Sequence, residues 1–123
     1  MNIFILIYFL LVHYFADFFL QSEWEANNKW NNHHALRGHV TSYFLALFVA
    51  ALLVEPNLNG FIIAFSFAVI NGWSHYLIDY VTSKLSHRFF VDEKRIRAGF
   101  KIVGFDQWCH VSILALTWYY LIG

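Results

Sequence analysis

The chain has 123 residues, which is enough for one compact unit and not for two. Hydrophobic residues make up 59% of the chain and charged residues only 13%, well below the usual charged fraction of a soluble protein. The formal net charge is zero, so nothing indicates a nucleic-acid-binding surface, and the single cysteine, Cys109, excludes an internal disulfide. This composition favours a membrane protein over a soluble one.

The apolar residues are gathered in four runs, and a helix needs about 20 such residues to cross the hydrocarbon core of a bilayer. We therefore predict an all-α, polytopic membrane protein whose single domain, residues 1–123, is a four-transmembrane-helix bundle. The expected helices cover about residues 2–21, 36–54, 61–83 and 103–121. A cleaved signal peptide is not expected, because no basic residue precedes the first run and no small-residue cleavage site follows it.

The basic residues predict the orientation of the bundle. All eight Lys and Arg residues lie in or beside the two segments that join the first predicted helix to the second and the third to the fourth. Four spans bring both segments to one side, which the positive-inside rule makes cytoplasmic, so both termini are expected outside the inner membrane. In residues 84–101 apolar and basic residues interleave, which fits either an amphipathic segment on an anionic leaflet or a solvated loop.

Ionisable side chains recur near the cytoplasmic end of every predicted helix. They are His13 and Asp17, then His39, then His75 and Asp79, and finally Asp106 and His110. Within each pair the spacing is four residues, so both side chains share one face of their helix. At a rise of about 1.5 Å per residue, all of them lie within about 15 Å of the cytoplasmic helix ends. We therefore expect them to meet at one depth.

The charge of this group indicates what would bind there. Three aspartates with four neutral histidines leave three negative charges, and beyond Arg37, at the cytoplasmic start of the second helix, no lysine or arginine lies within the predicted spans. Either the aspartates take up protons or cations bind. Mixed imidazole and carboxylate ligands suit zinc, with manganese and iron as alternatives, and one or two ions would fit. A single His–Asp pair is more often an interhelical hydrogen bond, so this prediction depends on the shared depth. The predicted ligands are His13, Asp17, His39, His75, Asp79, Asp106 and His110.

An ordered set of short motifs covers nearly the whole chain. It reads His13-x3-Asp17-Phe18-x2-Gln21, Lys29, His39-x3-Tyr43, His75-x3-Asp79-Tyr80-x3-Lys84 and Phe105-Asp106-Gln107-x2-His110. The set resembles a domain-of-unknown-function family of small integral-membrane proteins from bacteria and their phages. That resemblance implies a membrane location and no established activity.

A more distant resemblance is to membrane-bound metal-dependent hydrolases, and through them to the helical zinc phospholipase C and single-strand nuclease group. This likeness implies phosphoester hydrolysis at a multinuclear zinc site. The chain departs from that group because it lacks a His-x-x-x-Glu pair. Its N-terminus is also expected far from the cluster.

The leading hypothesis is a membrane-embedded, metal-dependent hydrolase acting on a phosphoester or similar bond at the cytoplasmic face. A hydroxide held by the metal would attack, and Asp17, Asp79 and Asp106 are the candidate catalytic groups. The substrate would be a lipid or a phosphorylated small molecule that enters from the cytoplasm or the inner leaflet.

Three basic residues at the cytoplasmic rim could orient a phosphate group. They are Lys84, Arg37 and Arg88. The alternative is that they are ordinary topology signals.

Two other functions remain open on the sequence. Ionisable residues in membrane spans also mark metal-ion or proton carriers and channels. The outer half of every predicted helix lacks such residues, so a pathway would need a pore between the subunits of a homo-oligomer. The third hypothesis is a non-catalytic protein in which a structural metal or a hydrogen-bonded His/Asp cluster holds the bundle together.

Overall fold

The computed structural model describes residues 2–123, which form helices joined by short turns and, within that range, contain no β-strand. The predicted all-α fold is therefore confirmed. In chain order the elements are α1 (Ile3–Phe18), α2 (Glu23–Asn28), α3 (His33–Val54), α4 (Leu58–His87), the π-helical turn η1 (Arg88–Asp92) and α5 (Ile96–Leu121).

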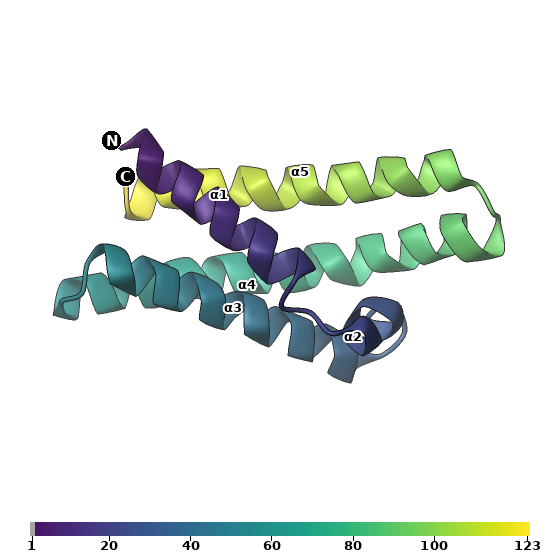
Figure 1. The fold of residues 1–123 in the computed structure, drawn as a ribbon, viewed down its shortest axis with the longest axis horizontal. Helices are drawn as coiled ribbons and strands as arrows, with labels where there is room; N and C mark the ends of the chain where they lie inside the picture. Colours follow the sequence, from purple (N-terminus) through teal and green to yellow (C-terminus); the bar gives the residue numbers. More distant parts are fainter. Residues whose placement is uncertain (1) are drawn as a thin grey trace.

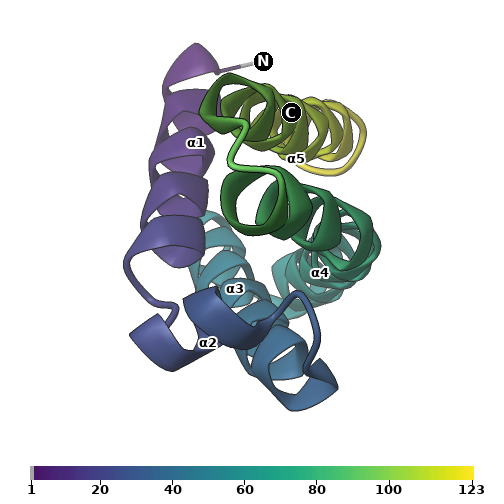
Figure 2. The same cartoon turned by 90° about the vertical axis from the view of Figure 1, so that its right-hand side faces the viewer.

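The long helices pack as a bundle in which α4 lies between α3 and α5, while α1 crosses diagonally over α3 and α5 (Figures 1 and 2). Both ends of the chain and the α3–α4 turn lie at one end of the bundle (Figure 1). The short helix α2 and the tip of the α4–α5 hairpin lie at the other. Consecutive long helices run in opposite directions, so the end of α1 meets the start of α3, the second half of α4 and the first half of α5.

Polar caps fix where the helices begin. Ser22 and Glu25 form a reciprocal capping box that starts α2, a helix that the hydrophobic pattern did not predict. Asn32 accepts hydrogen bonds from two backbone N–H groups, so α3 begins at His33, earlier than the predicted residue 36. Asn57 caps α4 in the same way. The first polar segment is therefore a folded helix–turn unit beside α3.

The α4–α5 connection differs most from the sequence-based prediction. Helix α4 and η1 continue to Asp92 and α5 begins at Ile96, so residues 84–101 form neither a long loop nor a separate surface segment. The Phe90 ring packs so closely on Gly99 that a Cβ at that position would overlap it. A tight hairpin results, and its tip projects beyond the end of α1 (Figure 1).

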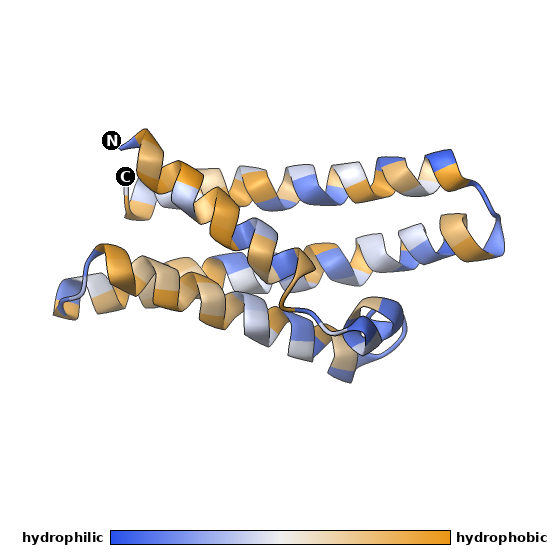
Figure 3. Ribbon diagram, in the orientation of Figure 1, coloured by the Kyte–Doolittle hydropathy of each residue, from blue (hydrophilic) through white to orange (hydrophobic). Residues whose placement is uncertain are grey.

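The half of the bundle next to the chain termini has an apolar core. Phe9, Leu47, Phe67 and Leu114 are fully buried there, and the Phe9 and Phe67 rings pack with their centroids 4.9 Å apart. Figure 3 shows hydrophilic residues concentrated instead in α2 and along the opposite half of α4 and α5.

Two of the described helices are long and apolar enough to cross a membrane, namely His33–Val54 and Leu58–Asp92. Helix α1 is also apolar but has only 16 residues. The coarse prediction of membrane-type helices therefore holds for α3 and α4. Four spans, and an outside location of the termini, stay predictions.

Candidate metal centre

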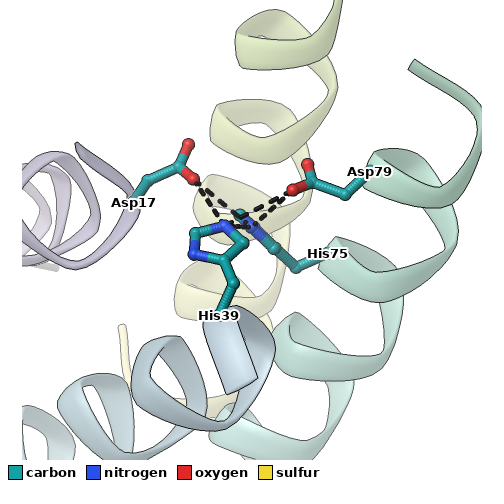
Figure 4. A group of neighbouring side chains, drawn as sticks. All are labelled: Asp17, His39, His75 and Asp79. Atoms are coloured by element: carbon teal, nitrogen blue, oxygen red, sulfur yellow. Dashed lines mark hydrogen bonds and ion pairs between the residues drawn. The ribbon is translucent and has the colours of Figure 1, made fainter. Parts of the chain in front are cut away.

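Side chains from three helices meet at the heart of a buried cluster, which is drawn in Figure 4. Asp17 comes from the end of α1, His39 from the start of α3, and His75 and Asp79 from successive turns of α4. The His39 Nε2 atom lies 3.1 Å from Asp17 Oδ1 and 3.4 Å from Asp79 Oδ2. The His75 Nε2 atom lies 3.4 and 3.6 Å from the same two oxygens. The two nitrogens are 2.9 Å apart, and all four residues are buried.

These separations fit a single metal ion. In a tetrahedral zinc site with bonds of about 2.0–2.1 Å, neighbouring ligand atoms lie about 3.3–3.4 Å apart. The five separations that involve a histidine nitrogen run from 2.9 to 3.6 Å and so bracket that value. A neutral imidazole nitrogen donates at most one hydrogen, so conventional hydrogen bonds use only part of this convergence. The group Asp17, His39, His75 and Asp79 could hold a metal ion.

A second group adjoins the first. Asp17, Asp106 and His110 also bring one potential ligand atom each within reach of a common ion. The His110 Nε2 atom lies 3.1 Å from Asp79 Oδ1 and 3.3 Å from Asp106 Oδ2. Asp17 thus belongs to both groups, and Asp79 faces both with different oxygens. Carboxylates shared in this way could bridge two metal ions.

Lys29 enters the cluster from outside the bundle, which the sequence analysis missed. Its Nζ lies 2.7 Å from Asp79 Oδ2, and its side chain is only 18% exposed. Burial lowers the pKa of the Lys29 ammonium, but Asp79, Asp17 and Asp106 together raise it by more, so the pKa lies above its ordinary value of 10.5. With Lys29 counted, the three aspartates leave an excess of two negative charges, which one divalent cation would neutralise.

The route of Lys29 to the cluster follows from local structure. Lys29 is the C-cap residue of α2, and α2 packs against α3. The Ser22-x-x-Glu25 capping box was the sequence signal that could have predicted this helix. Without it, residues 22–32 look like a solvated loop whose lysine points to water.

Gln107 connects the two groups by hydrogen bonds. Its Nε2 donates to Asp17 Oδ2 at 2.7 Å and to Asp106 Oδ2 at 3.1 Å. Its Oε1 accepts from His13 Nε2 at 3.1 Å, and His13 Nδ1 then accepts from the Tyr43 hydroxyl at 2.9 Å. Both ring nitrogens of His13 are therefore used within the protein, and His13 lies outside both ligand groups. We assign His13 a positioning role.

The histidine rings are held by packing. Among residues 2–123, neither His39 Nδ1 nor His75 Nδ1 has a hydrogen-bond partner. Metal-binding histidines usually donate that N–H group to an acceptor that fixes the ring. Here His75 is stacked between Tyr43 and His110, with ring centroids 4.1 and 4.0 Å away. Stacking therefore orients the ring that hydrogen bonding leaves free.

A cavity of about 160 Å³ lies beside the cluster. Its lining comes from α1, the segment that follows α1, Lys29, and the facing halves of α4 and α5. The lining residues are Asp17, Phe18, Gln21, Lys29, Asp79, Thr82, Ser83, Ser86, Ile102, Val103, Asp106 and Gln107.

The three basic residues predicted to orient phosphate lie elsewhere. The Lys84 ammonium sits over the Tyr80 ring at 3.6 Å, and Arg88 pairs with Glu93 at 2.7 Å. Arg37 lines a separate groove between α3 and α4. None of them is among the described residues that line the cavity beside the cluster.

Sequence comparison agrees with the resemblance noted above. The profile of a family described as "Protein of unknown function (DUF3307)" matches residues 5–123, so the chain belongs to this family. No curated protein and no solved structure matches the chain.

Proposed function

We propose that this member of the DUF3307 family is a membrane-embedded hydrolase that uses a divalent metal ion to cleave a phosphoester. The observation that carries the proposal is the convergence of two imidazole nitrogens and two carboxylate oxygens, all within 4.8 Å of one another, beside a cavity. Zinc suits this mixed ligand set best, with manganese and iron as alternatives.

In this proposal His39, His75, Asp17 and Asp79 hold the first ion. One ion neutralises the excess charge that remains after Lys29 is counted. The adjoining group Asp17, Asp106 and His110 could also hold an ion, but it stays without one in the one-ion state that the charge balance favours. Gln107 donates to both Asp17 and Asp106 and so fixes their relative positions, and His13 in turn orients Gln107.

The bound ion would supply the usual chemistry of such sites, lowering the pKa of a coordinated water towards neutrality. Asp106 lines the cavity, belongs only to the second group and is the candidate base for the water proton. The water oxygen forms a new bond to phosphorus while the ester P–O bond breaks. The leaving alcohol takes up the proton that the water gave to Asp106, and the products are the alcohol and the phosphate.

The membrane setting is supported by the outward-facing surface. Large apolar side chains are exposed along the helices, for example Phe4, Leu53 and Ile62. We propose that α1 and α5 cross the inner membrane together with α3 and α4. The cluster lies in the half of the bundle that carries α2 and the basic residues, so the positive-inside rule assigns it to the cytoplasmic side.

The test uses the full chain in detergent micelles. We expect wild-type protein to retain zinc, measured by elemental analysis, and to hydrolyse bis(p-nitrophenyl) phosphate. The variant His75→Ala should lose both, whereas His34→Ala, an exposed histidine at the start of α3, should keep both. Folded protein that retains zinc but hydrolyses no phosphoester would contradict the enzyme assignment and leave only a structural metal.

A further inference from the structure

We propose that the cavity beside the cluster binds the phosphoryl group of the substrate, with Ser83 and Lys29 donating hydrogen bonds to its oxygens. This inference rests on the proposed hydrolase function and names the part of the site that recognises substrate. It replaces the basic residues that the sequence suggested for this role, because those lie outside the cavity.

Three hydroxyl groups on α4 line the cavity, and only one of them is free among the described residues. The Thr82 hydroxyl is engaged by Ile78 O and by the Asp106 carboxylate, and the Ser86 hydroxyl donates to Ser83 O at 3.1 Å. Ser83 is 9% exposed, and its Oγ has no hydrogen-bond partner in residues 2–123. A buried hydroxyl without a partner is unfavourable, and a ligand in the cavity that Ser83 lines would satisfy it.

Lys29 supplies the second donor. Its ammonium has three N–H groups, and one of them is directed to Asp79. The remaining hydrogens are available to a phosphoryl oxygen at the cavity, which Lys29 lines. Charge-assisted hydrogen bonds of this kind are the stronger ones. Lys29 therefore links the metal-binding carboxylate to the incoming anion.

The three aspartates impose an order of binding. Without a metal ion the cavity is flanked by more negative than positive charge, so an anion would be repelled. Once a divalent cation has neutralised the cluster, the phosphoryl group meets the ion, Lys29 and Ser83. Phosphate binding should therefore depend on metal.

The size and lining of the cavity restrict the rest of the substrate. A volume of about 160 Å³ accommodates a phosphoryl group and a few further atoms. Phe18, Ile102 and Val103 give the cavity an apolar side, and Phe18 is 45% exposed. The organic part of the ester would leave the cavity over these side chains, which suits an amphiphilic phosphoester.

The experiment measures the affinity of inorganic phosphate for zinc-loaded protein in micelles by calorimetry. A hydrogen bond to a charged group contributes about 1.5–3 kcal/mol, so Ser83→Ala should weaken binding by at least about tenfold. Ser86→Ala is the matched control, since its hydroxyl is already bonded to backbone, and should change the affinity less than about twofold. Removal of zinc should abolish binding.

The outcomes separate this inference from the proposed function. Zinc-loaded protein that binds no phosphate, or binds it equally well in Ser83→Ala and wild type, overturns the phosphate site and leaves the metal centre standing. Folded protein that retains no zinc overturns both.

Competition then distinguishes the sources of the phosphoryl group. Displacement of phosphate by phosphatidic acid in the micelles supports a lipid substrate, and displacement by glycerol 3-phosphate alone supports a soluble one. If neither competes, the assignment of a phosphoester to this cavity is wrong.

Discussion

The two halves of the bundle are built by different rules. Near the chain termini, Phe9, Leu47, Phe67 and Leu114 interlock without charge, and any apolar set of the right shape would serve. In the other half every buried acid must be matched by a histidine, an amide or Lys29. An apolar core of the first kind would be enough to pack the helices together. Buried ionisable groups are unfavourable in such helices, so the second kind of core is consistent with the proposed function.

The contrast also bears on transport. In the described part of the chain, no His, Asp, Glu, Lys or Arg is buried between the cluster and the termini. A part-buried polar contact there joins Asn71 to Thr117, at 2.8 Å. Among residues 2–123, buried ionisable side chains therefore form no relay from the cluster to the chain termini. A carrier would need a path between subunits, as the sequence already indicated.

The strongest way to break the polar half is Asp79→Asn. The side chain keeps its shape but loses the charge that faces His39, His75, His110 and Lys29. We expect hydrolysis to fall about 10³-fold, which corresponds to about 4 kcal/mol. Steady-state kinetics with bis(p-nitrophenyl) phosphate would measure this. Asp92→Asn, an exposed acid at the end of η1, is the control and should retain full activity.

A substitution in the apolar half should lower the stability of the protein without changing its metal binding. Phe67→Ala removes a fully buried ring and should lower the free energy of unfolding by about 3–5 kcal/mol. Denaturant titration in micelles would measure the loss. Zinc content below the unfolding midpoint should match wild type. A parallel loss of zinc would mean that the two halves are not independent.

Replacement of Lys29 tests how much its positive charge stabilises the buried aspartates. Lys29→Met leaves Asp79 with one partner fewer, and the metal-free protein should lose about 3 kcal/mol of stability. Because the folded-state pKa of Lys29 is raised, its contribution is fully present below the ordinary value of 10.5 and is lost as pH rises through the raised pKa. The destabilisation, measured by unfolding at pH 6 to 9, should therefore be constant.

The smallest effects come from glycine. Gly104 on α5 has nothing within 4 Å of an added Cβ, so Gly104→Ala should stabilise the helix by about 0.5–1 kcal/mol. At Gly60, in the first turn of α4, an added Cβ would overlap the Glu55 carbonyl, so Gly60→Ala should destabilise. Thermal unfolding of the two variants should move in opposite directions. Shifts of the same sign would contradict the described α3–α4 turn.

Much of the site was predictable because helical periodicity carries it. The i, i+4 pairs and the shared depth predicted that Asp17, His39, His75, Asp79 and His110 would meet, and they do. Periodicity does not distinguish a ligand from its support, however. His13 shares the face of Asp17 but bonds to Gln107 and Tyr43.

The features that were missed depend on non-periodic structure. Lys29 reaches Asp79 because α2 folds back on α3, and only the Ser22–Glu25 capping box indicates that helix in the sequence. The end of α4 and the start of α5 were not predicted as helix because the basic residues in 84–101 lower the hydropathy. Length and hydropathy identify the apolar part of a helix, so they do not predict polar ends that extend beyond it.

The metal content of the full chain, purified in micelles, tests the account most directly. We predict about one zinc ion per chain, retained in His34→Ala and absent from His75→Ala, because one divalent ion balances three aspartates and Lys29. Well-folded wild-type protein without any divalent ion, or with the same content in both variants, would contradict it.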